Sequence, residues 1–340
     1  CSSYCNSIHP FRFSHKLEFH DWRGGVMYIG VDIGGTKCAV VLADAEGNIL
    51  QKARFATTTR DKTIEEILKN VKSFGAAAAV GISCGGPLDS KNGIILSPPN
   101  LPGWDYVEIV SIIERETGVK AFLQNDANAC ALAEWKYGAG IGCKNMVFLT
   151  FGTGLGAGLI LNGSLYSGTC AMAGEVGHIR LSECGPVGYG KAGSFEGFCS
   201  GNGLAQLGRL KAMELFQMGK TASFCTSLSK LDEITAKDIA LNANKGFEDA
   251  IEVYQSCGRY LGKGLAVIID ILNPERIVLG SVYARAEGLL KSEMLKVLEK
   301  ECLPQALGAC TILPAKLNEH VGDIAAASVA IEGERGNLPC

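Results

Sequence analysis

The sequence predicts a mixed α/β protein built from two lobes that face each other across a cleft. The chain has 340 residues, more than one hydrophobic core usually supports. An apolar strand, a glycine-rich turn and a second strand occur twice, with Gly34 and Gly152 at matching positions about 118 residues apart. A repeat of this kind predicts two related lobes. The 43 glycines against 10 prolines indicate tight turns and close backbone contacts rather than flexible linkers.

The first, smaller lobe is expected over residues 27–124 and begins with a β-hairpin that has glycines at its tip. Apolar runs mark its strands, and Ile64, Ile67, Leu68 and Val71 fall on one face of a predicted helix. Strands and helices mixed in this order form an α/β layer. The expected strands are 28–32, 38–43, 49–57, 78–83 and 120–123, and the expected helices are 63–73 and 106–117.

The second, larger lobe is expected over residues 125–321 and opens with a helix that runs to Tyr137. It repeats the strand, glycine turn, strand pattern, and helices then dominate the sequence. The expected strands are 146–150, 157–161, 277–280 and 311–313, and the expected helices are 203–218, 236–244, 247–272, 286–300 and, at the C-terminal end, 322–332.

Charge and hydropathy argue against nucleic-acid and membrane partners. The 32 Lys and Arg against 35 Asp and Glu give a net charge of -3, so no overall positive field attracts nucleic acid or an acidic membrane. The uncharged stretch between Lys144 and Glu175 contains seven glycines and a turn at 162–164, which predicts two strands and a hairpin rather than a membrane helix.

Cysteine usage and the N-terminal segment bear on where the protein works. The 14 cysteines contain no C-x-x-C pair, which predicts reduced thiols and a cytoplasmic location. Residues 1–26 lack the pattern of a secretory signal and are expected to form a disordered N-terminal extension. A homodimer is expected because it is the commonest soluble assembly.

Both glycine-rich turns are candidate phosphate-binding sites, because backbone N–H groups without side chains around them can surround an anion. Neither turn matches the P-loop or Rossmann pattern. One such turn is equally well explained as a turn alone, but two of them in two lobes favour a clamp around one nucleotide. The residues expected to bind the nucleotide are Gly34, Gly35, Thr36, Lys37, Gly152, Thr153 and Gly154.

Two aspartates at strand ends are candidates for the chemistry. Asp32 ends the first strand, where a carboxylate beside phosphates needs a divalent cation. We expect it to hold Mg²⁺ through water; the alternative is a turn-capping role. Asp126 lies between a strand and a helix, so it is either a helix N-cap or a general base at the edge where α/β clefts bind ligands.

Several motifs, taken in order, resemble those of ROK-family sugar kinases over residues 28–334. They are Asp32-Ile33-Gly34-Gly35-Thr36-Lys37, 97–104, Asn125-Asp126-Ala127-Asn128, 152–156, Glu175-Val176-Gly177-His178 and 273–280. The resemblance implies the actin- and hexokinase-like ATPase fold, with ribonuclease H-like lobes and an interlobe cleft that binds ATP and a hexose. It also implies that a C-terminal helix, 322–334, completes the first lobe.

The resemblance further implies roles for individual residues. Asp126 would take the proton from the sugar hydroxyl, and Gly280 would lie in the adenosine-binding segment. Amides, carboxylates and an imidazole suit the donors and acceptors of a sugar. The residues implied to bind the sugar are Asn100, Asn125, Asp126, Glu175, His178 and Glu196.

The implied cofactors are ATP and Mg²⁺, and the implied reaction is phosphorylation of a hexose. Glucose is expected as the substrate, because nothing in the sequence indicates a pocket for an N-acetyl group. Mannose, fructose, allose, N-acetylglucosamine and N-acetylmannosamine remain alternatives.

The sequence departs from the family at its zinc site. ROK kinases usually hold zinc with a histidine, here His178, and three cysteines. In an alignment on Glu196, the cysteine positions hold Val187, Tyr189 and Ser194. None of these side chains suits zinc, so no structural zinc is expected. Cys184 and Cys199 leave open a rebuilt site that includes His178.

Two other functions remain open. Some family members are sugar-responsive repressors with a helix-turn-helix ahead of the kinase-like body, but the residues before the first strand here lack an apolar helical period. A sugar-binding protein without catalysis is suggested by the missing cysteines, whereas Asp32, Asp126 and the two glycine turns argue against it.

Overall fold

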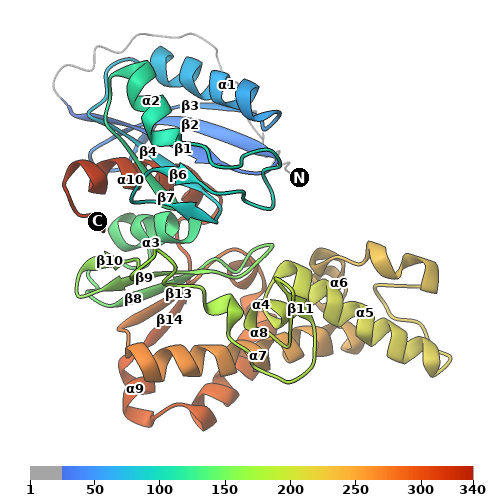
Figure 1. Cartoon of the computed structure of the whole chain (residues 1–340). Helices are drawn as coiled ribbons and strands as arrows, with labels where there is room; N and C mark the ends of the chain where they lie inside the picture. The colour runs from blue at the N-terminus through green and yellow to red at the C-terminus, as the bar shows by residue number, and fades with distance from the viewer. Residues whose placement is uncertain (1–24, 340) are drawn as a thin grey trace, which may run out of the picture.

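A computed structural model describes residues 25–339, which form two five-stranded sheets with helices on their faces (Figure 1). The expected N-terminal extension, 1–26, therefore lies almost entirely outside the described residues. Between residues 25 and 339, none of the helices combines the length and the apolar character that crossing a bilayer requires.

The first sheet joins an antiparallel meander to two parallel strands. Its order is β3 (Ile49–Ala56), β2 (Lys37–Asp44), β1 (Met27–Ile33), β4 (Ala79–Cys84) and β7 (Ala121–Asn125). Strands β1 and β2 are antiparallel, whereas β4 runs parallel to both β1 and β7. Helices α1 (Arg60–Ser73) and α2 (Ile109–Thr117) cover one face, where Ile67, Ile109 and Ile113 are buried against the strands.

The second sheet repeats this order and these strand directions. It consists of β10 (Ser164–Tyr166), β9 (Ala157–Leu161), β8 (Met146–Leu149), β13 (Arg276–Leu279) and β14 (Thr311–Pro314). The predicted repeat is confirmed, because each strand, glycine turn, strand unit forms the same hairpin in its sheet, β1–β2 in the first and β8–β9 in the second. The hairpin predicted at 162–164 is also present, between β9 and β10.

Helices pack on the outer face of the second sheet and extend beyond it. Val147 and Ile277 of the sheet share a core with Leu261 and Leu265 of α7. The helices of this part are α4 (Phe195–Phe198), α5 (Gly201–Gln217), α6 (Ala236–Ala243), α7 (Glu248–Leu272), α8 (Val282–Glu301) and α9 (Pro304–Ala309). Short 3-10 turns are η1 (Val176–His178), η2 (Leu228–Glu233) and η3 (Asn318–His320), and small hairpins are β5 (Leu88–Asp89) with β6 (Ile94–Ile95), and β11 (Val187–Gly188) with β12 (Lys191–Ala192).

Two alanine-rich helices cross between the sheets. Helix α3 (Asp126–Tyr137) follows β7 of the first sheet but packs on β8 and β9 of the second. Helix α10 (Val321–Glu334) follows β14 of the second sheet but packs on β1 and β4 of the first. The two helices also pack on each other, so they form the layer between the sheets (Figure 1).

Glycines in the strands allow these helices to approach closely. A Cβ atom on Gly81 of β4 would lie 2.2 Å from the carbonyl oxygen of Ala326 in α10. A Cβ atom on Gly158 of β9 would lie 2.5 Å from the carbonyl oxygen of Ala127 in α3. Such distances are well inside van der Waals contact, so both positions require glycine.

Several helix starts differ from the prediction, and the largest differences are in α1, α2 and α8. Helix α1 begins at Arg60 rather than at 63. Helix α2 begins at Ile109 rather than at 106, because Tyr106 has a left-handed φ of 54° and Val107 forms a β-bridge with Ile95. Helix α8 begins four residues before the predicted 286 and contains a kink at Ala286, where φ is -127°.

Candidate active site

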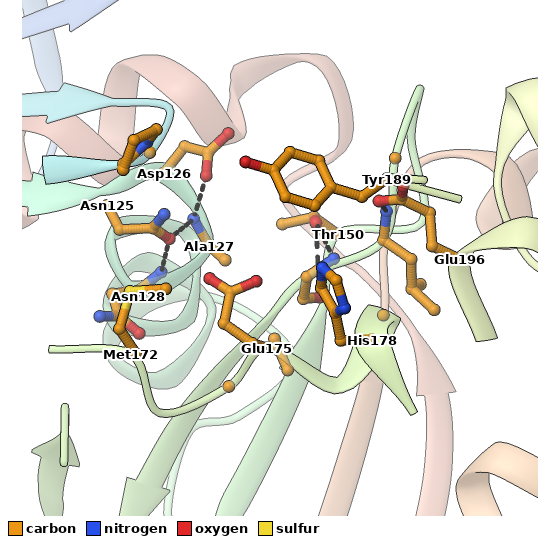
Figure 2. Close-up of a pocket in the computed structure, with 18 of the residues that line it drawn as sticks. Asn125, Asp126, Ala127, Asn128, Thr150, Met172, Glu175, His178, Tyr189 and Glu196 are labelled. Carbon is orange, nitrogen blue, oxygen red and sulfur yellow. Dashed lines mark hydrogen bonds between the residues drawn. The ribbon is translucent and has the colours of Figure 1, made fainter. Parts of the chain in front are cut away.

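A cleft of about 720 Å³ opens beside the N-terminal end of α3 (Figure 2). The loop after β4 and the junction between β7 and α3 form one wall. The second glycine turn, the segment around η1 and the β11–β12 hairpin form the other. The lining consists of residues 86–88, Asn100, 125–128, Thr150, 152–157, 171–175, 177–178, Tyr189 and Glu196. The structure therefore brings together all six residues expected to bind the sugar.

The N-terminus of α3 positions Asp126. Asn125 is the N-cap: its Oδ1 accepts hydrogen bonds from the N–H groups of Ala127 at 2.8 Å and Asn128 at 3.4 Å. Asp126 is the first residue of the helix rather than its cap, and its Oδ1 also accepts from the Ala127 N–H at 2.8 Å. The capping alternative for this junction thus applies to Asn125, and the Asp126 carboxylate remains accessible from the cleft.

The surroundings of Asp126 make its carboxylate more basic. Desolvation raises the pKa of Asp126, and the negative charge of Glu175 acts in the same direction, although the hydrogen bond from Ala127 opposes the shift. A carboxylate with a raised pKa holds a transferred proton more tightly, as a general base requires.

Glu175 and His178 face Asp126 from the segment around η1 (Figure 2). The segment is held against β9, because the Ala157 N–H donates to the Gly174 carbonyl at 2.8 Å. Gly174 has a φ of 95°, and a Cβ there would lie 2.0 Å from the Ala157 carbonyl oxygen. Desolvation raises the pKa of Glu175, while the nearby His178 lowers it.

The second glycine turn is fixed by hydrogen bonds to its neighbours. The Gly152 N–H donates to the Gly154 carbonyl at 3.1 Å, and the Gly156 N–H donates to Oγ1 of Thr150 at 3.0 Å. The Leu155 N–H donates to Oε2 of Glu196 at 3.0 Å. Glu196 therefore links this turn to the other residues expected to bind the sugar.

Gly280 lies behind the second turn rather than in the cleft lining. Its N–H donates to the Leu149 carbonyl at 2.9 Å, and the Val282 N–H donates to the Phe151 carbonyl at 2.7 Å. The segment that follows β13 is thus attached directly to the turn that follows β8.

The first glycine turn approaches the cleft from the other lobe. The Gly34 N–H donates to the Lys37 carbonyl at 3.2 Å, and a Cβ on Gly35 would lie 2.4 Å from the Asn100 carbonyl oxygen. Asn100 lines the 720 Å³ cleft, but residues 34–37 are not among the described residues that line it. The structure therefore places the first turn behind Asn100, not in the wall itself.

Asp32 is a carboxylate at the edge of this region that lies close to other acidic side chains. Desolvation, followed by the negative charges of Asp126 and Asp323, raises the pKa of Asp32 to about 6. Lys52 only partly offsets this, because it also pairs with Asp323. The excess of negative charge suits a divalent cation, and Mg²⁺ usually keeps several waters beside one or two carboxylates.

The residues at the family's zinc position do not suit a zinc ion. Val187 and Tyr189 of the β11–β12 hairpin offer no zinc ligand, and the Ser194 hydroxyl caps α4 by accepting from the Gly197 N–H. Across residues 25–339, no group of three or more His, Cys, Asp or Glu side chains is arranged to hold a metal ion.

The sequence interpretation did not assign several residues that line the cleft. Asn128 is buried, its Nδ2 donates to Oε1 of Gln124 at 3.2 Å, and its Oδ1 has no hydrogen-bond partner among the described residues. Asn128 belongs to the motif Asn125-Asp126-Ala127-Asn128, so the sequence could have indicated that it lies at the site. Met172 had no comparable signal, because the folding of its loop brings it to the cleft, whereas Tyr189 stands at one of the family's cysteine positions.

The two lobes, their matching sheets and the cleft between them define an actin- and hexokinase-like ATPase fold. Residues 28–332 match the ROK family, and the chain belongs to that family. Over 311 residues it is 31% identical to a glucokinase from Thermotoga maritima, and the match covers 89% of this chain and 97% of the relative.

A solved structure and a regulator extend the comparison. The crystal structure of a ROK family glucokinase from Streptomyces griseus in complex with glucose and AMPPNP matches with a TM-score of 0.73 and 30% identity, over 90% of this chain and 100% of that one. The chain is also 25% identical over 315 residues to a xylose repressor from Bacillus spizizenii, covering 89% of this chain and 77% of the repressor.

Proposed function

We propose that the protein transfers the γ-phosphoryl group of MgATP to a hydroxyl of a hexose, with glucose as the acceptor. The observation that carries the proposal is the accessible Asp126 carboxylate at the N-terminus of α3, which faces a cleft whose opposite wall holds Glu175 and the glycine turn at 152–154. The similarity to glucokinases, one of them solved with glucose and AMPPNP, supports this donor and acceptor.

In this proposal Asp126 accepts the proton of the attacking sugar hydroxyl as the new bond to phosphorus forms. Its raised pKa supports that role. Asn100, Glu175 and His178 orient the sugar through its other hydroxyls, and the N–H groups of the second turn orient the phosphates for in-line attack. Enclosure between the lobes limits water as a competing acceptor.

We further propose that Asp32 holds Mg²⁺ through water. The raised pKa of Asp32, caused by burial beside other carboxylates, supports a site that gains from a bound cation. When bound, the metal supplies positive charge to the transferring phosphoryl group.

The function is tested by replacing Asp126 with Ala and with Asn and measuring ADP release over a panel of hexoses. We expect glucose to be the best acceptor for the wild type and kcat to fall by about 10²- to 10⁴-fold in both variants, the usual contribution of a general base. The KM for ATP should stay within about twofold, since Asp126 contacts the acceptor.

Asp61→Asn is the matched control, because Asp61 is an exposed carboxylate that pairs with Arg60 in the first turn of α1. It should retain full activity. Unchanged turnover in the Asp126 variants would contradict the assignment.

Similarity to the xylose repressor favours a second candidate, a sugar-responsive regulator that binds a hexose without phosphorylating it. That function predicts hexose binding in calorimetry, no ATP consumption with any hexose, and a DNA shift that the sugar alters. Rapid ADP release with glucose would exclude it.

We also propose a cytoplasmic homodimer. The cysteines among residues 25–339 are free thiols, which suits a reducing compartment. Light scattering coupled to gel filtration tests the dimer, and a monomer mass at micromolar concentration would contradict it.

A further inference from the structure

The tip of the β11–β12 hairpin has an unusual backbone. Gly188 pairs with Lys191, so Tyr189 and Gly190 form a two-residue turn. Both have positive φ, 45° at Tyr189 and 76° at Gly190. Turns of this kind favour Asn-Gly, because a residue with a larger side chain is strained in the left-handed region. Strain of this sort is typical of functional sites.

The strained turn directs Tyr189 into the cleft. Its ring lies edge-to-face against that of His178, with centroids 5.2 Å apart and planes at 76°. Figure 2 shows the ring above His178, with the hydroxyl directed toward the side of the cleft on which Asp126 lies. The side chain lines the cleft and is 70% exposed. A large aromatic surface therefore faces the space between Asp126 and His178.

Polar contacts hold this hairpin without a metal. The side-chain amide of Gln206 accepts from the Val187 N–H at 2.8 Å and donates to the Val187 carbonyl at 2.9 Å. Lys191 Nζ donates to the His178 carbonyl at 2.7 Å, and the Ser194 hydroxyl donates to the Gly188 carbonyl at 3.4 Å. The three residues that stand at the family's cysteine positions, Val187, Tyr189 and Ser194, thus all take part in ordering the hairpin or His178.

We propose that Tyr189 is a sugar-binding residue of this metal-free hairpin. Its ring fixes the orientation of His178 and forms one wall of the acceptor site, against which the C–H face of a hexose packs. The contribution of its ring to binding explains why a strained, accessible tyrosine occupies this turn. The inference rests on the proposed function and names a further substrate-binding residue for it.

The test separates binding from folding by replacing Tyr189 with a residue that suits the turn. Asparagine accepts the left-handed conformation, so Tyr189→Asn relieves strain while it removes the ring. We expect an equal or higher melting temperature, a glucose Kd about 10-fold weaker, as expected for loss of one aromatic contact, and an unchanged KM for ATP. A residue with only a structural role would not give this combination.

Two further variants sharpen the result. Tyr189→Phe keeps the ring and should bind glucose within about twofold of the wild type. Tyr166→Asn is the matched control, since Tyr166 is a half-exposed tyrosine on β10 outside the cleft lining, and it should leave the glucose Kd unchanged. An unchanged Kd in Tyr189→Asn, or an equal loss in Tyr189→Phe, would overturn the proposal.

Metal content gives an independent readout. Wild-type protein incubated with zinc and then desalted should contain far less than one zinc per chain by mass spectrometry, and a chelator should leave its melting temperature unchanged. Stoichiometric zinc would overturn the metal-free hairpin.

Calorimetry without ATP keeps this inference distinct from the proposed function. If the wild-type protein binds glucose but does not phosphorylate it, the kinase function is refuted, and the glucose Kd values of the Tyr189 variants still test the binding role of Tyr189. Wild type that binds no hexose at all would refute both.

Discussion

The β1–β2 and β8–β9 hairpins are the same structure with different chemistry. Each is the central hairpin of a five-stranded sheet, with a glycine turn at its tip and a parallel strand on its other side. When Gly34 is matched with Gly152, the half-buried carboxylate of Asp32 corresponds to the hydroxyl of Thr150. Asp32 carries charge to the edge of the cleft, whereas Thr150 closes its own turn by accepting from Gly156.

This difference indicates that the two lobes contribute different groups to the site. The first turn is bonded to Thr57, which follows β3: its hydroxyl donates to the Gly34 carbonyl at 2.6 Å and its N–H to the Thr36 carbonyl at 3.0 Å. Asp32, before this turn, carries the carboxylate proposed to act beside Mg²⁺. The second turn is bonded to Glu196, in the wall proposed to bind the sugar, and to the segment after β13. In the proposed function, a repeated backbone therefore supplies charge from one lobe and positioning from the other.

The largest expected effect tests whether the helix contacts are equivalent in the two sheets. Gly81→Ala and Gly158→Ala each place a methyl group against helix backbone, and each should lower the free energy of unfolding by about 3 kcal/mol in urea titrations. Gly288→Ala is the control, because nothing lies within 4 Å of its Cβ position in α8, and it should stabilise by about 0.5–1 kcal/mol. Tolerance of alanine at only one of the two strand positions would break the comparison.

The next effect concerns charge. Asp32→Asn should lower kcat/KM for MgATP by about 100-fold, since it removes the carboxylate proposed to hold the metal. The same variant should be more stable than the wild type at neutral pH. Burial raises the pKa of the Asp32 carboxyl to about 6. The protonated carboxyl therefore makes its full contribution to stability below about pH 4, and that contribution is lost as the pH rises through 6 and the group ionises.

The stability gain of Asp32→Asn should therefore reach up to about 3 kcal/mol above pH 7 and vanish near pH 4. Chemical denaturation at a series of pH values without Mg²⁺ measures it. A gain that does not change with pH would show that the shifted carboxylate is not its source.

Thr150→Val tests the uncharged residue that corresponds to Asp32 in the second sheet. It removes the acceptor for the Gly156 N–H at similar side-chain volume, so we expect a loss of about 1 kcal/mol in the free energy of unfolding. Because no titrating group changes, the loss should be the same at pH 5 and pH 8. A pH-dependent loss would contradict the contrast with Asp32.

The smallest expected effect concerns the turns after the matching parallel strands. Gly85 and Gly86 follow β4, whereas Gly280 and Ser281 follow β13, and Ser281 has a φ of 47°. Ser281→Gly makes the second lobe like the first and should raise stability by about 0.5 kcal/mol, measured by thermal unfolding. Destabilisation would mean that the contact of Ser281 with Arg285 outweighs the strain.

Much of this arrangement is predictable from local sequence, and the remainder depends on tertiary contacts. Apolar periodicity and the glycine pattern indicate both hairpins and most helices, and the Asn125-Asp126 junction indicates a site at a strand end. Local pattern did not indicate that Asn125 caps α3 in place of Asp126, because both residue types suit that position. The positions of Tyr106 and Tyr189 depend on left-handed backbone that aromatic residues rarely adopt.

The exchange of α3 and α10 between the sheets has a consequence for synthesis on the ribosome. Gly30 and Gly81 shape a surface on the first sheet that α10 covers, and α10 lies near the C-terminal end of the described chain. The nascent first lobe must therefore keep an apolar face uncovered until α10 has been synthesised. A chain that stalls before α10 leaves that face exposed to chaperones and proteases.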